Sequence, residues 1–177
     1  MTPDWTRHII AEMLVWSFRT QFGWVAALAD NHALIKTTLP KKTRAAALAQ
    51  LSLQATRVTA ADEDAIKIRT ERQIRSFLAG RRKEFTLPID ISSGTTFQQQ
   101  IWELTRAIPY GSVITYLELA CAAGRPGAAR AVGQCMALNP LPLVIPCHRV
   151  VGSSGNLRGF GGGLPMKRRL LRMEGAL

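Results

Sequence analysis

Long apolar runs are missing from this 177-residue sequence, and no stretch approaches the ~18 consecutive apolar residues of a membrane-spanning helix. The first residues include the charged side chains of Asp4, Arg7 and Glu12, and no sustained apolar segment precedes them. That is not the pattern of a secretory signal peptide. We therefore expect a soluble, cytoplasmic protein without a membrane partner.

Cysteine is also scarce. The three cysteines, Cys121, Cys135 and Cys147, are widely spaced and odd in number, which argues against a disulfide framework and for a reducing compartment. No cysteines and histidines have the spacing of a zinc site, so we expect no bound metal. Cys121 and Cys135 lie among alanine and methionine in segments expected to be helical, which predicts small core hydrophobes.

Acidic residues are outnumbered. Twelve aspartates and glutamates stand against 23 lysines and arginines, which gives a net charge of +11. Such an excess favours a polyanionic partner, with nucleic acid ahead of an anionic membrane surface. The alternative is a charge that only keeps the protein soluble. The apolar fraction of 47% is ordinary for a folded protein, so extensive disorder is not expected.

The first half of the chain has the pattern of a small α/β unit. Short apolar runs within 13–40, broken by glycine and by an Asp-Asn pair, predict two or three strands joined by hairpins. Helices are predicted over 41–55, which is rich in alanine and leucine, and over 62–78, which begins with three acidic residues. The segment 84–95 has a proline, a glycine and paired serines, and it predicts a linker.

The second half is predicted to be mostly helical. Apolar residues recur every three or four positions over 97–108 and lie on one face of a helix. Thr115 and Glu118 fit a capping box, so a helix is expected over 115–123. A glycine-bearing turn then leads into another helix over 127–138. Two short helices joined in this way are a helix-turn-helix candidate.

The helix over 127–138 consists mainly of small residues, and Arg130 is its only charged residue. Small residues let a helix approach another surface closely, and its N-terminus attracts phosphate. One long cation there could reach into a groove or a base stack. Alternatively, the small residues pack against a neighbouring element while Arg130 faces water. The composition leaves both interpretations open.

Cys147 and His148 stand side by side in an otherwise apolar run. A thiol beside an imidazole can fill the core, form half of a metal site, or act as a nucleophile. Because the thiolate is the reactive form, we expect the neighbouring His148 and Arg149 to lower the pKa of Cys147, with Pro146 fixing the backbone before it. Adjacent residues of a strand point to opposite faces, so a non-strand geometry or a bridging water is expected.

A last helix is predicted near the C-terminus, with Pro165 at its start and Gly175 at its end. Glu174 lies in its final turn, where the helix dipole disfavours a carboxylate. A residue in a locally poor position predicts a tertiary partner, and histidine is a candidate.

Three motifs together resemble a known family. They are PCHRV at 146–150, RAVGQCMALNP at 130–140, and GFGGG followed by RRLLRMEG at 159–175. This combination is similar to that of the O6-alkylguanine-DNA alkyltransferases, also called methylated-DNA–protein-cysteine methyltransferases. The resemblance is strong over 96–175 and loose over 1–90.

The resemblance implies an α/β fold with two domains. A small N-terminal α/β domain would span 1–88, with an antiparallel sheet and helices arranged as in ribonuclease H. A linker over 89–95 would lead to a mostly helical domain over 96–177. That second domain would carry the alkyltransferase site and a winged helix-turn-helix-like DNA-binding motif.

The resemblance also implies catalytic roles. Cys147 would attack the alkyl carbon on guanine O6 and keep the alkyl group, with His148 as its base through a water. Glu174 would orient His148, and Asn139 would support the turn behind the cysteine. Tyr116 would donate a hydrogen bond or a proton toward guanine N3.

Further residues are implied to bind the DNA and the flipped base. Arg130 would replace the flipped nucleotide in the stack while its helix enters the minor groove. The other implied DNA-contacting residues are Thr115, Tyr116, Ala128, Ala129 and Gly133. The implied substrate-pocket residues are Met136, Pro142, Val150, Phe160 and Gly161. The loop reads FGGG at 160–163 where the family often has Tyr-Ser-Gly-Gly, so the range of alkyl groups accepted stays open.

The implied activity is direct reversal of DNA alkylation. One alkyl group would move irreversibly from O6 of guanine, or O4 of thymine, in double-stranded DNA to Cys147 of a monomer that needs no cofactor. The protein would lie at the nucleoid of a prokaryote or in the nucleus of a eukaryote. The alternative is an alkyltransferase-like protein that binds lesions without transfer, but those relatives lack the reactive cysteine. A third possibility is a helix-turn-helix transcription regulator, since regulatory relatives fuse this module to an N-terminal zinc-cysteine domain. No cysteine precedes Pro88 in this chain, which excludes that kind of regulator.

Overall fold

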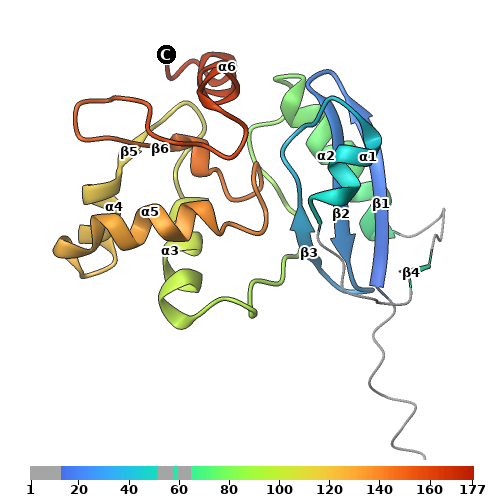
Figure 1. Ribbon diagram of the computed structural model, residues 1–177, viewed down its shortest axis with the longest axis horizontal. Helices are drawn as coiled ribbons and strands as arrows, with labels where there is room; N and C mark the ends of the chain where they lie inside the picture. Colours follow the sequence, from blue (N-terminus) through green and yellow to red (C-terminus); the bar gives the residue numbers. More distant parts are fainter. Residues whose placement is uncertain (1–12, 52–57, 60–64) are drawn as a thin grey trace, which may run out of the picture.

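A four-stranded sheet dominates the N-terminal half of the chain, on one side of the molecule in Figure 1. The computed structural model describes residues 13–51, 58–59 and 65–177. The sheet has the order β3-β2-β1-β4, and β1 pairs antiparallel with β2 and parallel with β4. Its strands are β1 (Met13–Thr20), β2 (Gly23–Ala29), β3 (Leu34–Thr37) and β4 (Val58–Thr59). The predicted hairpin strands within 13–40 are therefore confirmed.

Two helices accompany this sheet. α1 (Arg44–Ala49) packs with Ala26 on one face, and α2 (Ala65–Leu78) contributes Phe77 to the larger core on the other. The prediction of a helix over 41–55 was too long at its start, because the Thr43 side chain caps α1 by accepting a hydrogen bond from the Ala46 N–H. The other end of that prediction, after residue 51, and the acidic start predicted for α2 lie outside the described residues.

The segment 84–95, which the sequence predicts to be a linker, contains no helix or named strand, since α2 ends at Leu78 and the next helix begins at Thr96. It is nevertheless fixed to the sheet. The Leu34 N–H donates to the Pro88 carbonyl and the Asp90 N–H donates to the Leu34 carbonyl, both at 2.9 Å. The linker therefore extends the edge of the sheet at β3.

The C-terminal half is mainly helical, as predicted. Its helices and strands are α3 (Thr96–Arg106), β5 (Ile114–Thr115), α4 (Tyr116–Ala122), α5 (Ala129–Ala137), β6 (Val150–Val151) and α6 (Leu164–Glu174), and two 3₁₀ helices are η2 (Pro126–Ala128) and η3 (Cys147–Arg149). The predicted capping box of Thr115 and Glu118 is present at the start of α4. The helix predicted from residue 127 is α-helical only from Ala129, because the residues after the turn form η2 first.

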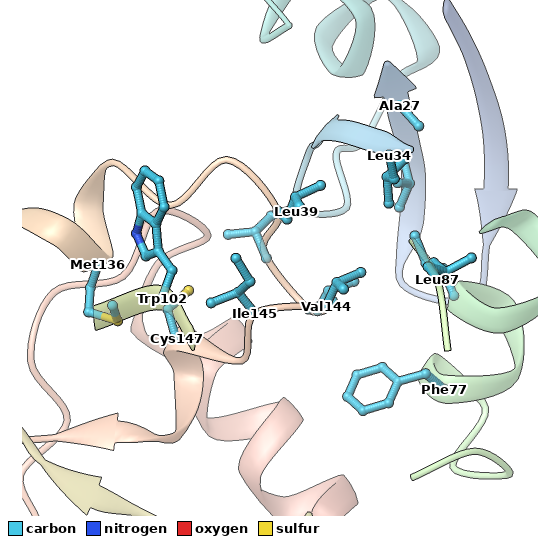
Figure 2. Close-up of a cluster of buried hydrophobic side chains, with 14 of the residues drawn as sticks. Ala27, Leu34, Leu39, Phe77, Leu87, Trp102, Met136, Val144, Ile145 and Cys147 are labelled. Carbon is cyan, nitrogen blue, oxygen red and sulfur yellow. The ribbon is translucent and has the colours of Figure 1, made fainter. Parts of the chain in front are cut away.

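One hydrophobic core runs through both halves of the molecule. Figure 2 shows Leu34 and Leu87 at one end, Val144 and Ile145 between, and Cys147 at the other end. Cys135 is buried, as predicted, but the prediction of a buried Cys121 was wrong, because this face of α4 points to solvent. No helix in the described part of the chain is long and apolar enough to cross a membrane.

Candidate active site

Cys147, His148 and Arg149 form the short 3₁₀ helix η3, so the expectation of a non-strand geometry is confirmed. The Arg149 N–H donates to the Pro146 carbonyl at 2.8 Å, which closes this turn. The three side chains then diverge. Cys147 is 7% exposed and lines a cleft, whereas His148 has no exposed surface.

The cleft has a volume of about 1240 Å³ and lies between α4, α5, the glycine-rich loop after β6, and the β3 side of the sheet. It brings together most of the predicted site. Ten predicted residues line it, namely Tyr116, Ala129, Arg130, Gly133, Met136, Asn139, Pro142, Cys147, Phe160 and Gly161. The predicted residues that do not line it are Thr115, Ala128, His148, Val150 and Glu174.

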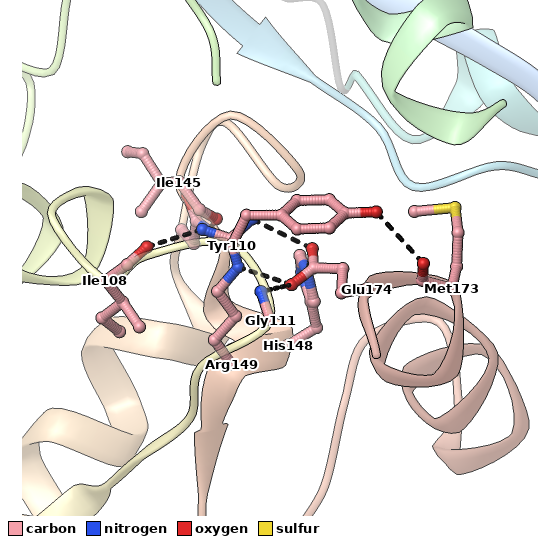
Figure 3. A network of polar contacts seen from close by, with 9 residues as sticks. Ile108, Tyr110, Gly111, Ile145, His148, Arg149, Met173 and Glu174 are labelled. Atoms are coloured by element: carbon pink, nitrogen blue, oxygen red, sulfur yellow. Dashed lines mark hydrogen bonds and ion pairs between the residues drawn. The ribbon is translucent and has the colours of Figure 1, made fainter. Parts of the chain in front are cut away.

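Glu174 is the centre of a buried polar network with His148, Arg149 and Gly111 (Figure 3). Its Oε1 accepts from His148 Nε2 at 2.8 Å and from Arg149 Nη2 at 3.0 Å. Its Oε2 accepts from Arg149 Nε at 2.8 Å and from the Gly111 N–H at 3.3 Å. The predicted histidine partner of Glu174 is confirmed. Both carboxylate oxygens are thus fully used, which fixes the carboxylate and the imidazole in place.

The same contacts determine the charges. Burial would raise the pKa of Glu174, but hydrogen bonds from His148 and Arg149, together with their charges, lower it to about 2. Burial lowers the pKa of His148, although the bond to Glu174 opposes the shift. At neutral pH the network therefore contains an ionised Glu174 and a neutral imidazole.

The tautomer of His148 follows from this state. An ionised carboxylate can only accept, so Nε2 carries the proton that it donates to Glu174. The other ring nitrogen, Nδ1, is then a proton acceptor. Nδ1 is buried and has no hydrogen-bond partner among the described residues. The imidazole is therefore oriented by Glu174 and keeps one basic nitrogen free.

Cys147 does not have the low pKa that its neighbours suggested. Burial raises the pKa of the thiol, while Asn139 and the charge of Lys167 lower it by lesser amounts. Arg149 does not lower the pKa of the thiol, because its guanidinium binds other groups. Its Nε donates to Glu174, and its Nη1 donates to the Ile108 carbonyl at 2.6 Å. The expectation that Arg149 activates Cys147 was wrong, and the resting residue is a neutral thiol.

Lys167 is a functional candidate that sequence reasoning missed. It is completely buried on α6, and its Nζ donates to the Val150 carbonyl at 2.6 Å. Burial lowers its pKa, and the interaction with Cys147 raises it. A lysine in a run of basic residues has no sequence pattern that distinguishes it as buried. Only its inward position on α6 reveals the link to the thiol.

The loop before Cys147 is held from both sides. Asn139 Nδ2 donates to the Ile145 carbonyl at 2.8 Å, and Asn139 Oδ1 accepts from the Leu141 N–H at 2.9 Å. From the sheet, the Thr37 N–H donates to the Pro140 carbonyl and the Thr37 hydroxyl donates to the Pro142 carbonyl, at 2.9 and 3.1 Å. The N-terminal half thus supports the loop that presents the thiol.

The far wall of the cleft is formed by α4 and α5. Tyr116 begins α4 and is partly buried, and burial together with Cys147 raises the pKa of its phenol. A Cβ added at Gly133 would lie 4.0 Å from the Tyr116 ring, so α5 passes close to this ring. Arg130 lies on α5, as Gly133 does, and its side chain is exposed. The Thr115 hydroxyl is used in the capping box with Glu118, and Ala128 belongs to η2.

Within residues 13–51, 58–59 and 65–177, no three histidine, cysteine or acidic side chains gather closely enough to hold a metal ion.

Comparisons with known proteins agree with this geometry. Residues 96–176 match the family model of the 6-O-methylguanine DNA methyltransferase DNA-binding domain. The chain is 47% identical over 102 residues to the methylated-DNA–protein-cysteine methyltransferase of Mycobacterium bovis, covering 58% of this chain and 61% of the relative. It is 52% identical over 86 residues to that of Salmonella typhimurium, covering 49% and 50%. The matched region thus spans less than two thirds of these curated relatives.

Solved structures extend the similarity over both halves. The structure of Mycobacterium tuberculosis OGT in complex with DNA has a TM-score of 0.76 and 32% identity, with 93% of each chain covered. The O6-methylguanine-DNA methyltransferase of Pyrococcus kodakaraensis has a TM-score of 0.63 and 25% identity, covering 92% of this chain and 99% of that one. The chain therefore belongs to the O6-methylguanine-DNA methyltransferase family.

Proposed function

We propose that this protein repairs O6-alkylguanine in DNA by transferring the alkyl group to Cys147. The observation that carries the proposal is that Cys147 lines the cleft while the next residue, His148, is held by the buried Glu174. Nucleophilic catalysis by a thiol uses such a combination of a cysteine at a ligand-sized cleft and a histidine base oriented by a third group. The family membership and the DNA-bound relative support the same conclusion.

The transfer is a single displacement at carbon. A bond forms between Cys147 Sγ and the alkyl carbon, while the bond from that carbon to guanine O6 breaks and leaves its electron pair on the purine. The thiol proton moves through a water to the free Nδ1 of His148, and Glu174 stabilises the resulting imidazolium. Tyr116 donates toward N3 of the leaving guanine. The product thioether has no leaving group, so each molecule reacts once.

The cleft walls hold the flipped guanine. Met136, Pro142 and Phe160 supply apolar surface, and the backbone N–H of Gly161 is available to O6. The carbonyls of Cys147 and Val150 would accept from the exocyclic amine. Val150 does not line the cleft itself, and its carbonyl is oriented by the hydrogen bond that it accepts from Lys167.

DNA binding belongs to α4 and α5, which act as a winged helix-turn-helix-like motif beside an N-terminal domain of the ribonuclease H kind. In this proposal α5 enters the minor groove of double-stranded DNA through its small residues Ala129 and Gly133, together with Ala128 of η2 just before it and Thr115 at the start of α4. A base must leave the stack before O6 can be reached, which costs a few kcal/mol. Arg130 offsets that cost by taking the place of the base. The protein acts as a monomer and needs no cofactor. Its place of action is the nucleoid of a prokaryote or the nucleus of a eukaryote.

A transfer assay tests the proposal. Duplex DNA with a labelled methyl group on guanine O6 should pass the label to the protein until one equivalent is bound, and then stop. The Cys147→Ala variant should bind the same duplex without taking up label. Sustained turnover, or full uptake by Cys147→Ala, would contradict the mechanism. Lesion binding without any uptake by the unaltered protein would favour the alkyltransferase-like alternative.

Arg130 is tested by comparing two substrates. Arg130→Ala should slow transfer from duplex DNA at least about tenfold, because the unstacking cost of a few kcal/mol is no longer offset. Transfer from the free O6-methylguanine base should stay unchanged. Arg130→Lys keeps the charge but loses the planar guanidinium, so it should restore only part of the rate. An equal loss on both substrates would refute the role in base flipping.

A further inference from the structure

The charged residues that line the cleft are all cations. They are Lys36, Arg130 and Arg158, and no aspartate or glutamate lines it. Lys36 is occupied, since its Nζ donates to the Leu51 carbonyl at 3.0 Å. Arg130 projects from α5, where the proposed function assigns it to the DNA stack. The third cation, Arg158, lines the same cleft and has no role in the proposed function.

Arg158 is positioned by the loop that follows Cys147. After β6 the chain turns tightly, with the Gly152 N–H donating to the Asn156 carbonyl at 2.9 Å. A Cβ at Gly152 would lie only 3.1 Å from Arg158 Nε and 3.3 Å from its Cγ. The arginine side chain therefore lies against the bare backbone of Gly152, five residues along the chain from Cys147.

The charge of Arg158 reaches as far as Tyr116 at the wall of the cleft. Burial and Cys147 raise the pKa of the Tyr116 phenol, and Arg158 opposes that shift. The guanidinium is thus within electrostatic range of Tyr116, which itself interacts with the thiol. Arg158 is exposed and makes no ion pair or hydrogen bond with the part of the chain that the structure describes. Its donors are free for a ligand, and a guanidinium fork matches a carboxylate best.

We propose that Arg158 is a specificity-determining residue that favours O6 adducts carrying a carboxylate, of which O6-carboxymethylguanine is the simplest, over neutral adducts of similar size. The inference rests on the proposed function. A carboxylate beside the reacting carbon repels the sulfur as it gains negative charge, and a guanidinium that pairs with the carboxylate removes this repulsion. Cys147 Sγ then bonds to the methylene carbon, the bond to O6 breaks, and S-carboxymethylcysteine is the product. The thiol proton goes to His148, as with a methyl group.

The test compares single-turnover rates on three duplexes that differ only in the O6 group: methyl, carboxymethyl, and the neutral carbamoylmethyl isostere. Arg158→Gln should slow carboxymethyl transfer about tenfold or more, the worth of one charge-assisted hydrogen bond, and leave the two neutral adducts nearly unchanged. Arg158→Lys should retain part of the carboxymethyl rate. Arg168→Gln, at an exposed arginine of α6 outside the cleft, is the matched control and should change none of the rates.

The outcomes separate the possible roles of Arg158. Equal slowing of all three duplexes by Arg158→Gln would mean that the arginine binds a DNA phosphate, and it would overturn the proposal. So would unchanged rates on all three. If the unaltered protein takes no alkyl group from the methyl duplex, the proposed function itself fails. If methyl transfer is normal and only the carboxymethyl preference is absent, the inference on Arg158 alone is wrong.

Discussion

At the scale of single residues, Cys147 and His148 form a neutral pair at rest. Burial raises the pKa of the thiol and lowers that of the imidazole. In the proposed transfer, the thiol proton therefore moves during the attack and not before it. This arrangement protects the thiol from chance oxidation or alkylation, because the thiolate is the reactive form. In the proposed transfer, His148 must accept the proton at that moment, so Glu174 has to hold the imidazole in the right orientation.

The pH dependence of transfer follows from these two shifts. The rate should be flat from about pH 6.5, the ordinary pKa of imidazole, to about pH 9, that of a thiol, because neither group titrates between them. It should fall only below pH 6.5, where His148 becomes protonated and can no longer accept. Single-turnover rates measured from about pH 5 to about pH 9 check this. A tenfold rise per pH unit above 6.5 would instead indicate a thiol that titrates alone.

Glu174→Gln tests the buried network. It leaves the Arg149 guanidinium without its counter-charge, which costs roughly 3–5 kcal/mol for a buried pair. Transfer should fall at least about a hundredfold, because His148 loses its orienting carboxylate. Glu103→Gln, at an exposed position on α3, is the control and should behave like the unaltered protein. A normal rate and a normal melting temperature for Glu174→Gln would contradict this account.

The acid stability of the protein depends on the same carboxylate. Its pKa is about 2 in the folded state and 4.5 ordinarily, so its contribution is complete above pH 4.5 and is lost as the pH falls toward 2. That contribution is on the order of 3 kcal/mol. Denaturation followed by pH should show this loss, and Glu174→Gln should lack it.

At the scale of elements, the sheet supports the loop before Cys147 through the hydrogen bonds of Thr37. Thr37→Val removes the hydroxyl bond to the Pro142 carbonyl and should cost about 1 kcal/mol while also slowing transfer, because the loop before Cys147 loosens. Thr38→Val is a close control. Its hydroxyl is also buried but accepts from the Ala26 N–H inside the sheet, at 3.0 Å. Thr38→Val should lose similar stability without slowing transfer. Equal effects of the two variants on transfer would refute a specific role for Thr37.

Sequence reasoning worked well where a local rule determines the structure. The capping box of Thr115 and Glu118 satisfies its own N–H groups, so the start of α4 could be predicted from two residues. The poor position of Glu174 in its helix correctly indicated a histidine partner. The contacts of Arg149, Lys167 and Thr37 could not be predicted in this way, because each depends on elements distant in the chain.

At the scale of the whole molecule, the two halves share one hydrophobic core, although the sequence suggests two domains and a linker. Val144 and Ile145, in the loop before Cys147, pack in the same cluster as Leu34 and Leu87 (Figure 2). Composition and periodicity describe elements one at a time, so they predicted the strands and helices but not this continuity. The shared core explains why a thiol in the second half can be held by a strand of the first.

The mass of the protein after incubation with duplex DNA containing O6-methylguanine reports both the transfer and the residue that receives the methyl group. Every active molecule should gain the mass of one CH₂ group, and fragmentation should place it on the peptide that contains Cys147. The Cys121 and Cys135 peptides should be unchanged. An unchanged protein mass, or a methyl group on any residue other than Cys147, would contradict the account.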